Sequence, residues 1–180
     1  MARPLEVVSH CSGWLTESQA LDNLGIPHEV LLASDINPAC KNFILRNFKV
    51  ETWVDDMTAE SAAHHGCDIY MCGFPCQPFS KAGKNRGMKD KRTQPMMAMV
   101  DYINRKQPCI AVLENVANFP TKHGVLFERL LNVLNESGLY EVHHKVLNTS
   151  DYGVPQNRER LYIVLILKRL IRLPFQFPEA

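Results

Sequence analysis

Short apolar runs alternate with amphipathic stretches along the chain, and this alternation constrains the fold more than any other feature of the sequence. Runs of strand length occur at 5–10, 28–34, 50–54, 69–72, 110–114, 140–147 and 161–167. Stretches with helical spacing include those at 96–105 and 125–137. Strands that alternate with helices predict an α/β domain with a mostly parallel sheet and helices on both faces.

Two further helices are indicated by the residues at their ends. Thr16 is placed to cap a helix that Gly25 ends, and Gln19 would complete a capping box with it. Asn37 followed by Pro38 predicts the start of another helix, because proline is favoured at the first helical position.

Length and charge limit the organisation of the chain. The 180 residues suffice for one domain with a real core, so we expect 1–180 to form a single domain. The formal net charge is only +1. A nucleic-acid partner would therefore be held by a local basic patch and not by the overall charge.

The cysteines and the N-terminus indicate a reducing compartment. None of the six cysteines forms a C-x-x-C pair, and no signal peptide is recognisable. We predict reduced thiols in an intracellular protein, nuclear in a eukaryote and cytoplasmic in a bacterium. His64, His65, Cys67 and Cys72 fit no common zinc spacing, so we predict no metal site. No apolar run is long enough to span a bilayer, and we expect no membrane partner.

The residues with chemical potential follow the predicted strands. They are Ser12-Gly13, Asp35, Asp56, Pro75-Cys76 and Glu114, one group after or at the end of each of the first five strands. Because the carboxyl ends of parallel strands meet at one edge of the sheet, where ligands bind in such folds, the sequence predicts a single site there.

Cys76 has two readings on pattern alone, and they are equally supported. A cysteine is often a small buried hydrophobe. A thiol at a strand end between prolines can also have a lowered pKa and act as a nucleophile. A phosphatase-type thiol site is excluded, because Ala82 stands where that site needs an arginine.

Three strings of residues separate these readings. Gly73-Phe74-Pro75-Cys76-Gln77-Pro78-Phe79-Ser80 resembles the catalytic motif of the cytosine-5 DNA methyltransferases. Leu113-Glu114-Asn115-Val116 and Gln156-Asn157-Arg158-Glu159-Arg160 resemble two later motifs of that family, in the same order. The resemblance extends from about Val7 to Pro178. It implies the Rossmann-like, S-adenosylmethionine-dependent methyltransferase fold.

The resemblance implies a role for each catalytic residue. Cys76 would attack carbon 6 of a cytosine that has left the duplex, which activates carbon 5 for methylation. Glu114 would hold the N3 and amino edge and supply a proton. Arg160 would bind O2, with Arg158 in support. Without the family, Glu114 would be read as a helix cap or half of an ion pair, and the arginines as a solvated turn.

The same resemblance implies a site for S-adenosylmethionine. Asp35 would hold the ribose hydroxyls and Ile36 would lie against the adenine. Asp56 would read the adenine amino group with Met57 beside it, and Pro75 would lie near the methionine part.

The first motif of the family is altered in this chain. An aromatic residue is replaced by Cys11, Gly13 is kept, and two later glycines are replaced by Leu15 and Thr16. We still assign Cys11 and Gly13 to the cofactor site. We expect the side chains of Leu15 and Thr16 to narrow the approach to the ligand, because glycine permits a closer backbone contact.

The loop after Cys76 is rich in basic residues. A solvated loop is the plain interpretation, but beside a cytosine-attacking thiol we assign it to phosphate contacts. The residues assigned to nucleic-acid binding are Ser80, Lys81, Lys84 and Arg86. The family's target-recognition domain and final motif do not follow, so no target sequence is predicted, and a partner protein or segment would supply recognition.

Three functions remain in competition. The first is methylation of cytosine in DNA, and the second is the same chemistry on transfer RNA. The third is a non-catalytic nucleic-acid-binding or regulatory module, which the altered first motif favours. Retention of Cys76, Glu114 and Arg160 together favours an enzyme.

Overall fold

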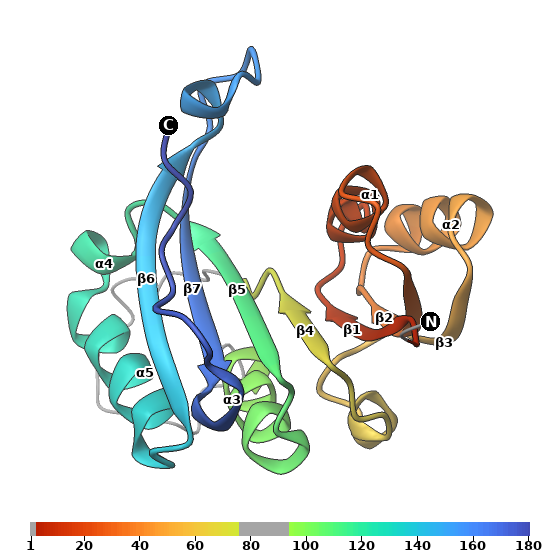
Figure 1. The fold of residues 1–180 in the computed structure, drawn as a ribbon. Coiled ribbons are helices and arrows are strands. Elements are labelled where there is room, and N and C mark those ends of the chain that lie inside the picture. Colours follow the sequence, from red (N-terminus) through yellow and green to blue (C-terminus); the bar gives the residue numbers. More distant parts are fainter. Residues whose placement is uncertain (1–2, 76–93) are drawn as a thin grey trace.

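The computed structural model describes residues 3–75 and 94–180, which form a seven-stranded sheet in the order β3-β2-β1-β4-β5-β7-β6 (Figure 1). The strands are β1 (Leu5–His10), β2 (His28–Ser34), β3 (Val50–Val54), β4 (Ile69–Cys72), β5 (Ile110–Val116), β6 (Tyr140–Asn148) and β7 (Glu159–Leu167). The helices are α1 (Thr16–Asn23), α2 (Pro38–Asn47), α3 (Gln94–Lys106), α4 (Phe119–Lys122) and α5 (Gly124–Glu136). Short 3-10 turns lie at η1 (Glu60–Ala63), η4 (Thr149–Tyr152) and η5 (Lys168–Leu170).

Strands β1 to β5 are parallel, and β7 runs antiparallel between β5 and β6. The prediction of a mostly parallel sheet is confirmed. The sheet grows from β1 in two directions, through β2 to β3 and through β4 to β5. The boundary between β1 and β4 is therefore a topological switch point, where a crevice forms outside the carboxyl ends of the strands.

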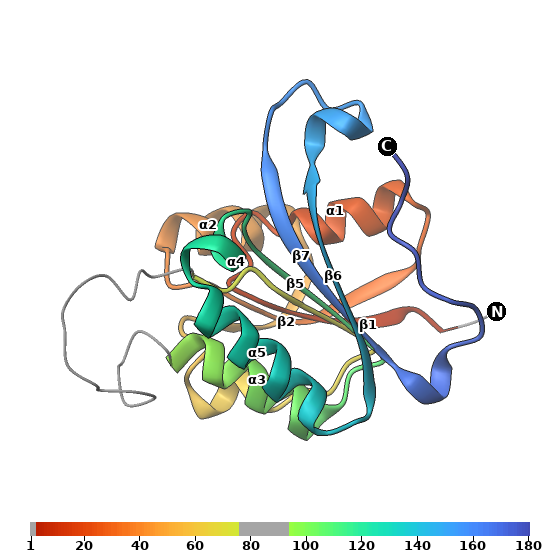
Figure 2. The ribbon, with the colours of Figure 1, turned by 90° about the vertical axis from the view of Figure 1, so that its left-hand side faces the viewer.

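Helices cover both faces, as predicted. α1 and α2 lie on one face, and α3 and α5 lie on the other (Figure 2). Alternate residues of β1 separate the two layers, because Val8 packs in the cluster that includes α3 and α5 while Val7 packs with Leu21 of α1. A third cluster joins Val30 of β2 to Ile44 of α2.

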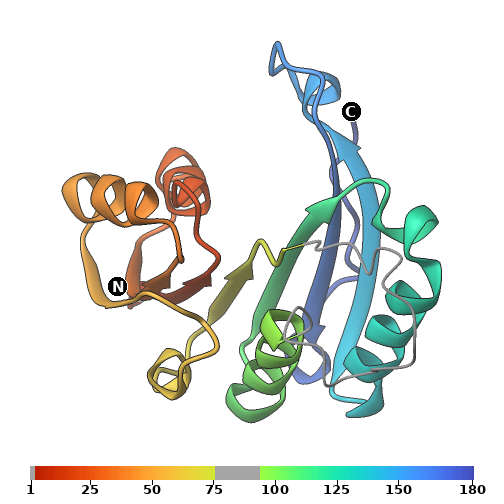
Figure 3. The same ribbon diagram turned by 180° about the vertical axis from the view of Figure 1, so that it is seen from behind.

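The α1 side of β6 and β7 is partly covered by the C-terminal segment instead of a helix. His144 of β6 contacts Phe127 of α5, whereas the neighbouring His143 faces the opposite way and contacts Phe175, with ring centroids 4.9 Å apart. The Tyr152 hydroxyl donates to the Pro178 carbonyl at 3.0 Å. This bond ties the segment to the tip of the β6–β7 hairpin, which projects beyond the rest of the sheet (Figure 3).

Local signals placed most elements correctly. The predicted bounds of β1, β2, β3 and β4 are confirmed. Asn37 caps α2, with its side-chain oxygen accepting from the Ala39 N–H at 2.9 Å, and Gly25 follows α1 at a φ of 66°. The predicted cap at Thr16 is wrong. Leu15 precedes the helix in a left-handed conformation, with no side-chain cap, and its carbonyl accepts from the Ser18 N–H at 3.1 Å.

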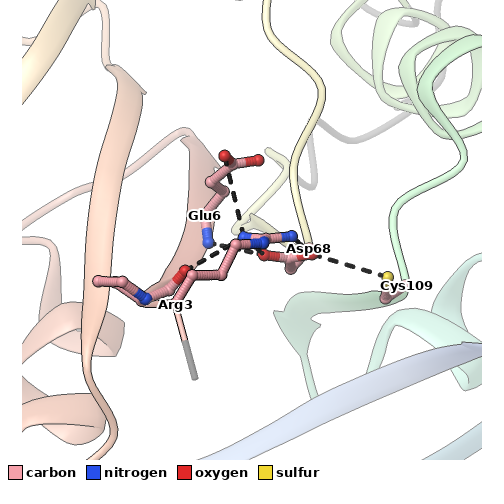
Figure 4. A network of polar contacts seen from close by, with 5 residues as sticks. Arg3, Glu6, Asp68 and Cys109 are labelled. Carbon is pink, nitrogen blue, oxygen red and sulfur yellow. Dashed lines mark hydrogen bonds and ion pairs between the residues drawn. The ribbon is translucent and has the colours of Figure 1, made fainter. Parts of the chain in front are cut away.

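An ionic network stabilises the edge of the sheet formed by the amino ends of the parallel strands, opposite the carboxyl ends where the crevice lies (Figure 4). Arg3 forms two hydrogen bonds with the Asp68 carboxylate, at 2.7 and 2.8 Å, and the Glu6 N–H donates to the same group at 2.9 Å. The Asp68 carbonyl also accepts from the Ile110 N–H at 3.0 Å. One residue thus joins the starts of β1, β4 and β5.

Within the described residues, no helix is long and apolar enough to cross a membrane.

Candidate active site

The ends of β1, β4 and β5 come into contact at Gly73. A Cβ atom added to this glycine would lie 3.4 Å from the Cys11 carbonyl oxygen and 3.6 Å from Glu114 Oε2. A Cβ atom would thus make ordinary van der Waals contact with both groups, which shows how closely the three segments approach one another. The segment that leads to Cys76 therefore passes directly beside Glu114.

Glu114 and Arg160 form an ion pair at this edge, with Arg160 Nε 2.8 Å from Glu114 Oε1. The two side chains are 33% and 25% exposed, so the pair is shielded but open to a ligand. The expectation that Glu114 ends its strand is wrong, because β5 continues to Val116 and pairs there with Arg160 of β7. The ion-pair interpretation of Glu114 is confirmed, and each group orients the other, whereas the implied catalytic role stays a prediction.

Asn115 fixes the backbone that precedes the predicted nucleophile. Its buried side chain donates to the Phe74 carbonyl at 3.0 Å and accepts from the Val116 N–H at 2.8 Å. The Phe74 ring packs edge-on against Phe119, with centroids 5.8 Å apart. Sequence reasoning quoted Asn115 within a motif but gave it no role. The available signal was an amide that follows the apolar run of β5, because an amide needs hydrogen-bond partners when it is buried.

Several of the predicted site residues lie outside the described part of the chain. Cys76 is one of them. The others are the residues assigned to nucleic-acid binding, Ser80, Lys81, Lys84 and Arg86.

An open pocket of about 520 Å³ adjoins the ion pair, lined by 116–118 and 156–160. This volume falls in the range of small-molecule sites, roughly 300–1,000 Å³. Arg158 lines the pocket, and its backbone N–H donates to the Asn148 side chain at 3.0 Å. The same asparagine donates to Asn157 at 2.8 Å. The hairpin therefore presents Arg158 and Arg160 on one wall, opposite the end of β5.

Asp35 and Gly13 meet at the carboxyl ends of β1 and β2. Asp35 Oδ2 accepts from the Gly13 N–H at 2.9 Å, and Oδ1 accepts from the Asn37 N–H at 2.8 Å. Each oxygen keeps a further lone pair for a ligand hydroxyl. Ile36 beside it is 80% exposed and offers an apolar surface. This donor and acceptor set fits a ribose next to an aromatic base.

The segment after β3 supplies a second carboxylate. Asp56 Oδ1 accepts from both the N–H and the hydroxyl of Thr58, each at 2.8 Å, which leaves Oδ2 for an amino group. Met57 is buried and its sulfur accepts from the Cys11 thiol at 3.4 Å. Cys11 thus contacts the same segment as Asp56. Pro75 is exposed at the end of β4.

Leu15 and Thr16, which replace two glycines of the family's first motif, have different environments, because Leu15 lies in the core and not at the predicted cofactor site. Leu15 is fully buried and packs with Val30, Ala33 and Ile44, so the expectation that it narrows the approach is wrong. Thr16 is exposed. Leucine is tolerated here because its left-handed backbone, at a φ of 53°, turns the side chain into the core.

A mostly parallel sheet with a switch point at β1 and β4, and acidic residues after β2 and β3, defines the class of Rossmann-like α/β folds. The family model for C-5 cytosine-specific DNA methylase matches residues 5–180. The chain belongs to this family.

Relatives and solved structures agree with this assignment. The chain is 42% identical to the type II methyltransferase M.HaeII of Haemophilus aegyptius, over 70% of this chain and 38% of the relative. It is 45% identical to M.NgoBI of Neisseria gonorrhoeae, over 62% and 34%. It therefore spans just over a third of the length of these relatives.

The fold resembles that of solved methyltransferases. The S. pombe Dnmt2 methyltransferase matches with a TM-score of 0.76 at 20% identity, over 95% of this chain and 53% of that one. A putative DNA modification methyltransferase of an E. coli prophage matches with a TM-score of 0.72 at 25% identity, over 96% and 49%.

Proposed function

We propose that this chain methylates carbon 5 of cytosine in DNA, as the catalytic domain of a cytosine-5 methyltransferase. The observation that carries the proposal is the Glu114–Arg160 ion pair, held beside Gly73 only three residues before Cys76. Because Cys76 follows Gly73 by three residues, we infer that its thiol acts at the same edge of the sheet as the Glu114 carboxyl group and the Arg160 guanidinium.

Each side chain has a step that its chemistry suits. The Cys76 thiolate adds to carbon 6 of cytosine, and the electron pair of the 5,6 double bond moves toward carbon 5. Glu114 holds the N3 edge and supplies a proton there, while Arg160 stabilises the charge at O2. S-adenosylmethionine, when bound, supplies the methyl group. Loss of the carbon 5 proton to a base then allows the carbon–sulfur bond to break, so that Cys76 leaves as thiolate and the N3 proton returns to Glu114.

Most of the residues that hold the cofactor in this proposal follow the first three strands, and Pro75 follows β4. Asp35 takes the ribose hydroxyls, and Gly13 fixes that carboxylate through its N–H, 2.9 Å away. Asp56 receives the adenine amino group, and Ile36 lies along the base. Cys11, Met57 and Pro75 complete the contact surface.

The nucleic acid must present an unstacked base, because a thiol cannot reach carbon 6 within a helix. The pocket between β5 and the β6–β7 hairpin is open enough to receive one, with Arg158 on its wall. Ser80, Lys81, Lys84 and Arg86 would contact phosphates, which adds affinity without sequence choice. Target choice would come from a partner or a further segment.

Covalent trapping tests the mechanism. Duplex DNA with 5-fluorocytosine and S-adenosylmethionine should give an adduct that resists denaturation, because fluorine at carbon 5 prevents the final elimination. Cys76→Ser should abolish the adduct. Cys109→Ser is the matched control, since this cysteine lies at the opposite edge near Asp68, and the variant should trap normally.

The outcomes separate the competing functions. Methyl label that enters transfer RNA but not DNA would overturn the choice of substrate. The absence of an adduct from folded chain that binds the cofactor, even with a separate recognition domain added in trans, would overturn catalysis. The regulatory interpretation would then stand.

A further inference from the structure

His10 is a buried polar residue at the end of β1. It is the last residue of β1 and only 1% exposed. Its Nε2 atom lies 3.1 Å from the Ala62 carbonyl oxygen, and its Nδ1 atom lies 2.9 Å from the Tyr70 hydroxyl. A carbonyl can only accept, so Nε2 carries the proton and Nδ1 accepts from Tyr70. Burial lowers the pKa of His10 to about 4, which keeps the imidazole neutral near pH 7.

The surrounding aromatic residues hold this imidazole in one orientation. Its ring stands edge-on to Tyr70 and Tyr102, at centroid distances of 5.3 and 5.2 Å. These two rings stack on each other at 4.4 Å. The Tyr102 hydroxyl donates to the His65 carbonyl at 2.8 Å. The cluster thus joins β1, β4 and α3 to the segment that follows β3.

A chain of hydrogen bonds leads from His10 to Asp56. The Ala62 N–H donates to the Ala59 carbonyl, and the Ala59 N–H donates to the Asp56 carbonyl, each at 3.0 Å. The position of Ala62 therefore limits the position of Asp56. The contact between Cys11 and Met57, at 3.4 Å, makes a second link between the same two segments.

We propose that His10 is a positioning residue for the cofactor, which clasps the 56–63 segment to the end of β1 so that Asp56 is already in place before the ligand binds. A leucine or valine would fill this position in a strand without needing two hydrogen-bond partners. A histidine at this position forms hydrogen bonds to Ala62 and Tyr70. These bonds fix the segment that carries Asp56, which packing by an apolar side chain would not do. This inference rests on the proposed binding of S-adenosylmethionine.

Two variants and a matched control test the clasp. His10→Leu removes both hydrogen bonds, and Tyr70→Phe removes only one, which leaves a milder variant if the first folds poorly. Tyr140→Phe is the control. It removes a buried tyrosine hydroxyl that donates to the Pro108 carbonyl at 2.8 Å, next to the amino end of β5, away from the site.

Affinity for S-adenosylhomocysteine is measured by calorimetry, and amide hydrogen exchange over 56–63 is measured without any ligand. We expect His10→Leu and Tyr70→Phe to weaken binding about 10-fold, which is about 1.4 kcal/mol. Both should speed exchange across 56–63. Tyr140→Phe should lower the melting temperature yet leave affinity and exchange in 56–63 unchanged.

A conservative replacement separates positioning from general stability. His10→Gln can donate to Ala62 and accept from Tyr70 through its amide, so it should recover much of the affinity lost in His10→Leu. Unchanged affinity in His10→Leu, or equal losses in Tyr140→Phe, would overturn the proposal. If wild-type protein binds no cofactor, the proposed function fails in that respect. Hydrogen exchange over 56–63 then still decides whether His10 holds the segment, and no change there would reject the clasp.

Discussion

At the scale of single residues, Leu15 combines an unfavourable backbone with a favourable side chain. Its left-handed conformation, with φ 53° and ψ 40°, disfavours a residue that has a Cβ atom by about 1–2 kcal/mol. Its side chain is fully buried between β2 and α2, and losing such a side chain typically lowers stability by about 2–5 kcal/mol. The burial term is larger, which explains why a leucine can replace the family's glycine.

Leu15→Gly should therefore destabilise the protein even though it restores the family's residue. We expect a net loss of about 1–3 kcal/mol in the free energy of unfolding, the difference between the two effects. Urea denaturation monitored by circular dichroism measures it. Leu24→Ala is the control, because that leucine is largely exposed and should change stability little. Unaltered stability in Leu15→Gly would show that backbone strain outweighs burial.

We expect the function of the Glu114–Arg160 pair to depend on the planar geometry of the guanidinium as well as on its charge. Arg160→Lys keeps the positive charge but loses the planar group that contacts Glu114 at 2.8 Å. We expect kcat to fall by more than about 10-fold, because two groups that act on the base lose their orientation. The affinity for S-adenosylhomocysteine should not change.

The matched control for this variant is Arg129→Lys, on the exposed side of α5, which should leave kcat unaltered. If Arg160→Lys lowered the affinity for the cofactor without lowering kcat, Arg160 would act on the cofactor and not on the base, and the proposed role would be wrong.

At the scale of elements, the bounds of the strands could be predicted from the sequence better than their pairing and direction. Periodicity and turn residues gave the bounds of β1 to β4, because each is a short apolar run between clear breakers. The direction of β7 follows from pairing with β5, which no local pattern encodes. The pairing also extends β5 past Glu114 to Val116. Thr16 has the right chemistry for a cap, but the core contact of Leu15 decided where α1 begins.

The same limit applies to the site. Asp35, Asp56 and Glu114 were singled out because acidic residues after or near the end of an apolar run stand out in the sequence. Asn115 and His10 were not, because their roles depend on partners at Phe74 and Ala62 that lie far along the chain.

The ionic network around Asp68 predicts that the stability of the fold depends on pH. Hydrogen bonding from Arg3 lowers the pKa of Asp68 below its ordinary value of 3.8. A carboxyl group whose pKa is lowered in the folded state stabilises the fold above its unfolded pKa, and this contribution is lost as the pH falls through the folded value. Asp68→Asn should cost about 1 kcal/mol at pH 7, where Glu6 and Arg3 both lose a charged acceptor.

Melting curves of wild type and Asp68→Asn across pH measure this effect. The difference between them should shrink as the pH falls below 3.8. Asp101→Asn is the control, since its ion pair with Arg105 is exposed on one helix and should contribute little. A difference that stays constant with pH would mean that the bonds of Asp68 do not depend on its charge.

At the scale of the whole molecule, the proposed ligand would join two halves of one sheet. The units of β1 to β3 carry Asp35 and Asp56, whereas β4, β5 and β7 carry Gly73, Glu114 and Arg160. Within the sheet, the halves are joined by the β1–β4 pairing, over four residue pairs from Val7 and Ile69 to His10 and Cys72. A cofactor bound at this boundary contacts the ends of both strands, so it should stabilise the two halves together.

Ligand-induced stabilisation tests this arrangement. At about 100 times its Kd, S-adenosylhomocysteine should raise the free energy of unfolding by about 2.7 kcal/mol. Hydrogen exchange should slow on both sides of the boundary, in β2 and β3 as well as in β4 and β5. Asp35→Asn should weaken binding about 10-fold, because the ribose loses a charged acceptor, and at the same ligand concentration the stabilisation should fall by about 1.3 kcal/mol. Protection confined to β1, β2 and β3 would place the ligand on one half alone, and the active-site residues would then be linked to the cofactor only through the chain.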